Sequence, residues 1–387
     1  MTQSRALWLD YMRSFITVLV VAYHSSLAYT TYAYFNTKTY SLSTHPIVDR
    51  FRWIGMDIFA HFNDIFFMSL MFFISGLFVY KNLQLKGPKL FLIDRLKRLG
   101  IPFLLGVSII LPLAFFPSFY LSHHSLNIID YLKDFLLNQD WPIGPPWFLW
   151  VLLVFNAISI FIPLNLYSSI SHKIFNYSKS PLKLFISLYF YLCLAFIPLS
   201  LYFGHYKWLG IGPFDFQVNR ILLYFSIYIF GCFLGSGNWE KYFYTNKKLL
   251  AIKWTFWLFF CLLSFFITVL FGFNFWEIIN STFLSNTYGL LIFNLLFVLS
   301  CLSIIFCFLA IFKLTIHTPI KTLTNLSSCA FGIYLIHYAF ITWLQFILLN
   351  FSLPIVFKFL CVFFGSLFLS WCFVYFLRRF AFFKQLL

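Results

Sequence analysis

Two ionisable residues lie inside the first membrane-length apolar run of this sequence, WLDYMRSFITVLVVAYHSSLAYTTYAY at positions 8–34. Arg13 and His24 are eleven positions apart. On a helix that turns about 100° per residue they share one face and stand roughly 16 Å apart along it. Because burying a charge in hydrocarbon is costly, such residues are expected to line a polar cavity or pathway. The alternative is an arginine that snorkels from a helix end and a histidine that is hydrogen-bonded in the core.

Two arginines lie at the start of the third apolar run, in DRLKRLGIPF. Arg95 and Arg98 are three positions apart, which makes them neighbours on one face of a helix. Guanidinium groups bind phosphate through paired hydrogen bonds, so these two residues and Arg13 are candidates to hold a phosphorylated cytoplasmic ligand. The alternative is that they only fix the topology, because cytoplasmic helix ends are rich in arginine.

Polar residues also collect toward the opposite ends of the spans. Asp64 lies near the start of the second run, where a carboxylate close to His24 could orient the imidazole and stabilise its charged form. Tyr334 and His337 are three apart in SSCAFGIYLIHYAF, and Trp147 opens the fourth run in GPPWFLWVLL. We expect these three to bind substrate. The alternatives are a hydrogen-bonded bundle histidine and an interfacial tryptophan anchor.

The composition requires many membrane-spanning segments to position these residues. Of 387 residues, 61% are hydrophobic and only 10% are charged, far from the roughly 25% charged residues of soluble proteins. Eight cysteines lie singly in apolar runs, with no CxxC pair and no histidine at metal spacing, so neither a disulfide framework nor a metal site is expected. The first apolar run is too long and too polar for a cleavable signal peptide. The net charge of +16 is spread among loops, and no nucleic-acid partner is expected.

Hydrophobic runs of spanning length predict an all-α polytopic membrane protein, a bundle of about ten transmembrane helices forming one domain over residues 1–387. The runs fall at 8–34, 62–80, 99–120, 145–165, 182–203, 218–236, 250–272, 284–312, 325–350 and 353–377. The connecting segments alternate in basic content, with nineteen Lys and Arg on one side and seven on the other. By the positive-inside rule both termini are predicted to be cytoplasmic. The loops 35–61 and 121–144 are predicted to be extracytoplasmic and ordered.

The spacing of these ionisable residues, together with the apolar runs, resembles that of a known protein family. Arg13 and His24, with ten residues between them, and the Arg-x-x-Arg of Arg95 and Arg98 match two signatures of the bacterial membrane acyltransferase 3 family, which O-acylates sugars and glycans outside the cytoplasm. Also similar, in family order, are LDYMRSFITVLVVAYHSS, FFMSLMFFISGLF, PPWFLWVLLVF and SSCAFGIYLIHYAF. The resemblance covers nearly the whole chain and is greatest to the branch that contains the periplasmic-glucan succinyltransferase. Some members carry a fused hydrolase-like domain, which is not expected here.

The resemblance implies an integral O-acyltransferase in the inner membrane of a bacterium. Acyl-CoA, either acetyl-CoA or succinyl-CoA, would bind from the cytoplasm through Arg13, Arg95 and Arg98, and a glycan hydroxyl would be acylated on the other side. The phosphopantetheine arm, on the order of 15 to 20 Å long, matches the roughly 16 Å rise from Arg13 to His24. His24, assisted by Asp64, would act as a general base or carry the acyl group covalently.

Two other classes of function fit the same residues. In a transporter or flippase, Arg13, His24 and His337 would line a substrate pathway without making or breaking bonds. A non-catalytic partner of a biosynthetic complex is the third possibility. The sequence does not distinguish acetyl from succinyl, and it identifies neither the acceptor glycan nor the oligomeric state. Turnover of acyl-CoA to free CoA only in the presence of a glycan would separate the enzyme from the transporter.

Overall fold

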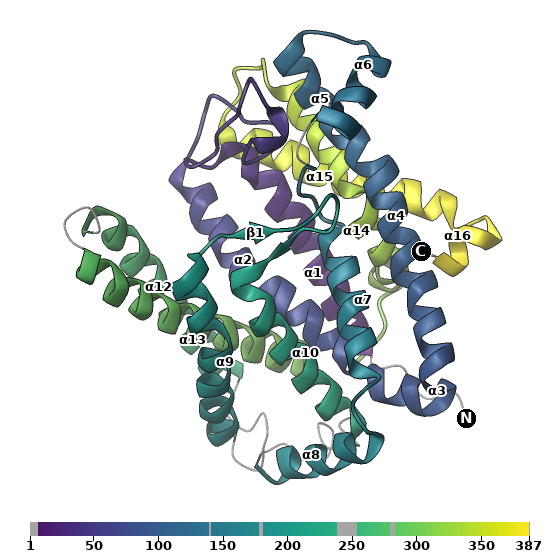
Figure 1. Cartoon of the computed structure of the whole chain (residues 1–387), viewed down its shortest axis with the longest axis vertical. Helices are drawn as coiled ribbons and strands as arrows, with labels where there is room; N and C mark the ends of the chain where they lie inside the picture. The colour runs from purple at the N-terminus through teal and green to yellow at the C-terminus, as the bar shows by residue number, and fades with distance from the viewer. Residues whose placement is uncertain (1–6, 139–140, 178–180, 238–253, 279–282, 387) are drawn as a thin grey trace.

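Helices make up almost all of the structure, a computed structural model in which residues 7–138, 141–177, 181–237, 254–278 and 283–386 are described (Figure 1). The helices are α1 (Leu7–Ser26), α2 (Ile54–Gly76), α3 (Val79–Arg95), α4 (Ile101–Leu105), α5 (Leu111–His123), α6 (Ile128–Lys133), α7 (Trp147–Ser159), α8 (Leu164–Tyr177), α9 (Pro181–Phe203), α10 (Ile221–Ser236), α12 (Trp254–Ile278), α13 (Phe283–Thr315), α14 (Lys321–Leu348), α15 (Ile355–Leu377) and α16 (Ala381–Leu386). The strands β1 (Trp208–Leu209) and β2 (Phe216–Gln217) form an antiparallel hairpin.

Each of the ten predicted runs contains a helix, which confirms the all-α class. Among the described residues, eight helical segments are long and apolar enough to cross a membrane, and the pair α7–α8, bent by 102°, would make a ninth. The bend comes just before Pro163, which cannot continue a helix with an intact hydrogen-bond ladder. Although α1 has 20 residues, it is not among the eight, because Asp10, Arg13 and His24 reduce its apolar character.

Helices α1 and α14 lie side by side and run parallel, as three contacts in the same order along both helices establish. The Tyr11 hydroxyl is 2.6 Å from the Thr324 hydroxyl near the start of both helices. His24 meets His337 further along, and Gln345 Nε2 donates to the carbonyl of His24 at 3.2 Å. Because α15 returns beside α14, both described ends of the chain lie at the same end of the bundle. Which side of the membrane that end faces remains a prediction.

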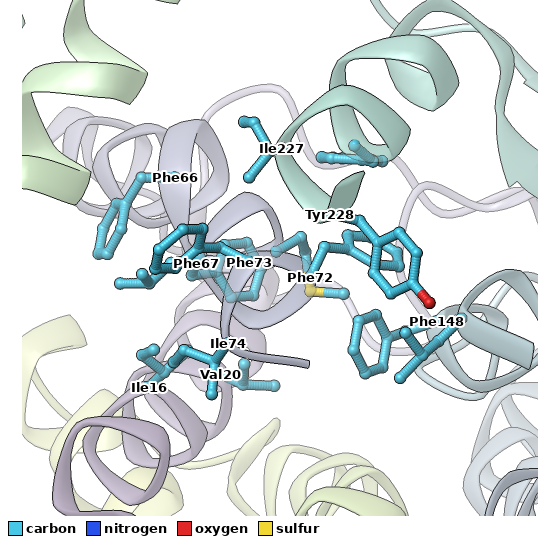
Figure 2. Packing of buried hydrophobic residues seen from close by; sticks show 14 of the residues in the cluster. Ile16, Val20, Phe66, Phe67, Phe72, Phe73, Ile74, Phe148, Ile227 and Tyr228 are labelled. Carbon is cyan, nitrogen blue, oxygen red and sulfur yellow. The ribbon is translucent and has the colours of Figure 1, made fainter. Parts of the chain in front are cut away.

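Helices α2, α10 and α13 are the most deeply buried spans. Within the protein, 61% of the α2 and α13 spans and 67% of the α10 span are buried, whereas only 22% of the α12 and α15 spans are, so the latter lie at the periphery. The ring of Phe72 on α2 packs against Phe148 of α7 with centres 4.7 Å apart, and Phe66, Phe73 and Tyr228 belong to the same buried cluster (Figure 2). A Cβ added at Gly76 would lie 2.3 Å from the carbonyl oxygen of Tyr228, so only glycine permits this close contact of the two helices.

The segment 79–123, predicted to begin with a loop at 81–98, is instead an almost continuous helix. Only Gly87 departs from helical geometry, at φ 72°, and it is followed by Pro88. The α-helical hydrogen-bond pattern is then replaced by π-helical turns at Leu96–Gly100 and Gly106–Ile110. π-turns inside helices are frequent at functional sites, and the first of these contains Arg98.

The segment between α1 and α2 is ordered, as predicted, and is fixed to three helices. Asp49 and Lys358 of α15 form a buried ion pair at 2.6 Å, with 3% and 0% of their side chains exposed. The Ser118 hydroxyl of α5 donates to the carbonyl of Pro46 at 2.6 Å. The amide of Thr31 donates to the carboxylate of Asp57, on the first turn of α2, at 2.7 Å. These contacts cover the end of α1 that carries His24.

Candidate functional site

A cavity of about 1230 Å³ occupies the end of the bundle beneath the 30–53 segment. Its wall combines apolar side chains with many aromatic and polar ones from α1, α2, α14 and the hairpin. Predicted site residues in the wall are His24, Asp64, Trp147 and Tyr334. A large, mostly apolar pocket with a few convergent polar groups is the usual form of a small-molecule binding site.

The centre of the candidate site is a pair of histidines. His24 Nδ1 lies 2.9 Å from the carbonyl oxygen of Val20, one turn earlier, and 3.3 Å from Nε2 of His337. Because a carbonyl only accepts hydrogen bonds, Nδ1 of His24 must carry the proton. His337 Nδ1 lies 2.7 Å from the carbonyl oxygen of Tyr334 and is protonated for the same reason. Its Nε2 is therefore an acceptor for His24.

This arrangement leaves His24 Nε2 as an unprotonated nitrogen that makes no hydrogen bond within the described protein. His24 is half-buried and lines the cavity, so a ligand can reach it. The tautomer is set by the local helix, because the donor to the i−4 carbonyl can only be Nδ1. A neutral imidazole held in this form can accept a proton or attack an electrophile through Nε2.

Asp64 is not bonded to His24. Its Oδ2 accepts a hydrogen bond from Arg220 Nη2 at 2.7 Å, and its backbone carbonyl accepts from Nη1 at 3.2 Å. Arg220 is fully buried, and its guanidinium lies over the rings of Phe297 and Tyr206, at 4.8 and 5.2 Å. The expected carboxylate partner of the histidine is thus committed to an arginine, and the partner of His24 is His337.

Tyr334 and Trp147 both reach the cavity, but in different ways. The Tyr334 hydroxyl donates to the carbonyl of Pro145, which fixes the start of α7 against α14. The Trp147 ring lies 5.5 Å from Trp208 and 5.8 Å from Tyr224, centre to centre. His337 itself is fully buried behind His24 and does not line the cavity. Its predicted role in substrate binding stays a prediction, and in this structure His337 reaches the cavity through its contact with His24.

The three predicted arginines do not line this cavity. Arg13 lies on the same unbroken helix as His24 and is 3.5 Å from Asp10. Arg98 is 3.2 Å from Asp94 with 63% of its side chain exposed, whereas Arg95 is half-buried over the Phe91 ring. The two arginines therefore have different surroundings, with Arg95 at the end of α3 and Arg98 inside the π-turn Leu96–Gly100.

Two residues at the site, His45 on the cavity wall and Arg220 buried behind Asp64, had no signal in the sequence that marked them. His45, in the segment between α1 and α2, lines the cavity, and its buried Nε2 has no hydrogen-bond partner. Burial, and to a lesser extent the nearby His24, lowers the pKa of His45 to about 3. Arg220 lies at the start of the predicted run 218–236 and was counted only among the seven cations of the less basic side. A histidine in a loop and an arginine at the end of a span give no indication of the residues they contact, which lie far away in sequence.

A second, smaller cavity of about 690 Å³ lies at the opposite end of α14. It is bordered by Lys321, Arg378 and Arg379, and by hydroxyl and amide side chains such as Thr324 and Asn325. Four of the nineteen cations counted on the more basic side, Lys241, Lys247, Lys248 and Lys253, lie outside the described residues. Among the described residues no group of three or more His, Cys, Asp or Glu side chains is arranged to hold a metal ion.

Comparison with known proteins agrees with the sequence resemblance. A family model described as an acyltransferase domain matches residues 6–375, almost the whole chain. Two curated relatives are both named glucans biosynthesis protein C, from Shigella dysenteriae serotype 1 (strain Sd197) and Escherichia coli (strain SMS-3-5 / SECEC). Each is 27% identical over 248 residues, which are 59% of this chain and 57% of the relative. The chain thus matches little more than half the length of these relatives. No solved structure matches.

Proposed function

Because this chain belongs to the acyltransferase 3 family of membrane proteins, we propose that it transfers an acyl group from acyl-CoA to a hydroxyl of a sugar or glycan. The observation that carries the proposal is the His24–His337 pair, which leaves one basic imidazole nitrogen open to a large cavity. The acyl group would be acetyl or succinyl. The protein would lie in the cytoplasmic membrane of a bacterium, with both termini in the cytoplasm and with residues 1–387 acting as one domain.

In direct transfer, His24 Nε2 takes the proton of the acceptor hydroxyl as its oxygen attacks the thioester carbonyl. Collapse of the tetrahedral intermediate releases CoA, whose sulfur takes the proton back from Nε2, so an ester and free CoA result. His337 Nε2 accepts from the His24 Nδ1–H and stabilises the imidazolium while it exists. In the covalent alternative the same Nε2 attacks the thioester first and CoA leaves as its thiolate. The acceptor hydroxyl then takes the acyl group from Nε2, and its proton goes to the CoA thiolate, so the products are the same ester and free CoA.

The donor would enter from the opposite end of the bundle. Arg13 stands three turns of α1 before His24, and Arg95 and Arg98 supply further guanidinium groups for the CoA phosphates. With the phosphates held there, the pantetheine arm would carry the thioester toward His24. Asp10 and Asp94 are the present partners of Arg13 and Arg98, and both pairs are partly exposed. Phosphate can replace such carboxylates at little cost, because exposed pairs contribute little stability.

The acceptor side is supported by the chemistry of the cavity and by the relatives. Aromatic rings and hydrogen-bonding side chains together suit sugars, which present apolar ring faces and hydroxyl edges. The printed name of the relatives refers to glucans. The alternative, a transporter of an anionic or glycan-related substrate, would use the same cavity without bond chemistry.

The deciding experiment uses the purified full chain in lipid nanodiscs with acetyl-CoA or succinyl-CoA and a gluco-oligosaccharide. We expect release of free CoA that depends on the oligosaccharide, and a new ester on the sugar detected by mass spectrometry. A His24→Ala variant that is equally stable and monodisperse should release no CoA above background. Transport of the sugar into proteoliposomes without CoA release would instead support the transporter and overturn the proposal.

A further inference from the structure

We infer that the cavity contains a separate sugar-binding subsite, built around Asp64, Gln217 and Trp208, which anchors an oligosaccharide acceptor away from His24. The inference rests on the proposed function and deepens it. It changes the role of Asp64 from a catalytic partner of His24 to a residue that binds the acceptor. The class of ligand is a glycan of more than one sugar unit.

The first observation is that Asp64 is held rigidly with one oxygen to spare. Its Oδ2 and its backbone carbonyl are bonded to Arg220, whose guanidinium lies over two aromatic rings. Its Oδ1 makes no hydrogen bond within the described protein, and the side chain is 15% exposed on the cavity wall. A fixed carboxylate oxygen at a cavity wall is a strong acceptor for a sugar hydroxyl.

The second observation is a hydrogen-bond donor on the wall of the same cavity. Gln217, on β2, is buried at the cavity wall, and its Oε1 accepts a hydrogen bond from the Tyr224 hydroxyl at 3.2 Å. Its amide nitrogen is therefore the atom left to donate to a ligand. A hydroxyl both donates and accepts, so the amide of Gln217 and the carboxylate of Asp64 supply the two halves of what a sugar edge needs.

The third observation is an aromatic corner that faces the same space. The hairpin pairs Trp208 with Gln217, so both side chains come from adjacent positions of one small sheet. Trp208 is half-buried, lines the cavity and meets Trp147 edge to face at 5.5 Å. Trp150 Nε1 donates to the carbonyl of Asp215 at 3.0 Å, which fixes the hairpin to α7. Amphipathic aromatic rings held in this way suit the apolar face of a sugar ring.

The fourth observation is that this corner and His24 are separate parts of one large cavity. Asp64 is bonded to Arg220, whereas His24 is bonded to Val20 and His337, yet both residues line the cavity wall. The two polar groups are thus parts of one cavity. Its volume, about 1230 Å³, exceeds the roughly 300–1,000 Å³ of most ligand pockets. One sugar would leave most of it empty, while a chain of sugars can reach from Trp208 to His24.

The test measures binding and transfer separately. Isothermal titration of the full chain in nanodiscs, without acyl-CoA, compares a gluco-oligosaccharide with methyl glucoside. Variants are Trp208→Ala, Trp208→Phe and Gln217→Ala, with Trp343→Ala as the matched control, because Trp343 lies on α14 and does not line the cavity. We expect the oligosaccharide to bind more tightly than methyl glucoside, and Trp208→Ala to raise its dissociation constant by about tenfold or more. Trp208→Phe should restore most of the affinity, and the control should bind as the wild type does.

Steady-state assays supply the second readout. In Trp208→Ala the KM for the oligosaccharide should rise in proportion to the loss of binding, while the KM for acyl-CoA stays unchanged. Equal affinity of Trp208→Ala and wild type, or no oligosaccharide binding to the wild type, would overturn the inference. Binding that depends on Trp208 in a protein that fails to transfer acyl groups would instead overturn the proposed function and leave the sugar subsite in place.

Discussion

The two ends of α1 differ in how firmly their functional residues are held. At one end His24 is bonded to its own helix and to His337, and Gln345 fixes the backbone at the same level. At the other end Arg13 and Arg98 form ion pairs with Asp10 and Asp94, three and four residues earlier on their own helices, and are partly exposed. The first end is preorganised, as bond chemistry requires. The second is suited to the entry and release of a charged ligand.

The largest effect should come from removing the imidazole. His24→Ala should lower acyl transfer by about two to four orders of magnitude, because general base catalysis is typically worth that much. Binding of acyl-CoA, measured by equilibrium dialysis in nanodiscs, should be retained. His24→Gln keeps hydrogen-bonding groups at a similar size but has no basic nitrogen, so it should be as inactive as His24→Ala. Substantial transfer by a stable His24→Gln protein would remove His24 from the mechanism.

The segment that covers the His24 end of α1 can be loosened by a substitution far from His24, at the Asp49–Lys358 ion pair. Lys358→Met leaves the Asp49 carboxylate buried without its cation and should destabilise the protein by about 3–5 kcal/mol. The measurement is thermal unfolding in nanodiscs. Asp49→Asn combined with Lys358→Met removes both charges and should recover part of the loss. A single variant as stable as the wild type would show that this ion pair does not hold the segment over the cavity.

At the second end, replacing Arg95 should weaken acyl-CoA binding more than replacing Arg98. Arg95 is half-buried over the Phe91 ring. Arg95→Ala should weaken the free energy of acyl-CoA binding by about 1.5–3 kcal/mol, which is typical for the loss of a charge-assisted hydrogen bond. Replacing the more exposed Arg98 should cost less. Arg95→Lys should rescue only partly, because the fork is lost. The KM for acyl-CoA and direct binding are measured for each variant, and unchanged values in both would leave these residues a topological role only.

Most of the helices could be predicted from the sequence, because an apolar run of spanning length has few alternatives in a bilayer. The start of α2 was misplaced by eight residues, from 62 to Ile54. Its first turns carry Asp57, His61 and Asp64, which face a cavity and need not be apolar. The prediction of 81–98 as a loop was wrong for a similar reason: basic residues mark a membrane surface, not the end of a helix.

The site could be predicted only in part. His24 was identified because an ionisable residue within an apolar run is costly and therefore informative. Its partner was not, because His337 is 313 residues away and no local pattern links two histidines. Asp64 was assigned to His24 for want of a visible cation, since Arg220 comes from a different segment. Trp208 and Gln217 carry no signal until the hairpin brings them to the cavity.

The smallest effect expected is a pH dependence at the first end. Burial lowers the pKa of His45 to about 3, against roughly 6.5 in an unfolded chain. The unfolded state therefore binds more protons between these values. The stability contributed by neutral His45 is complete above about pH 6.5 and is lost as the pH falls toward 3, by about 1–2 kcal/mol at pH 5.

Thermal unfolding at pH 7 and pH 5 should show a smaller loss on acidification for His45→Gln than for the wild type. His124→Gln, at an exposed position of the same half, is the control and should behave as the wild type does. If His45→Gln loses as much stability as the wild type, His45 is not held neutral at the cavity, and the first end is less tightly closed than its contacts indicate.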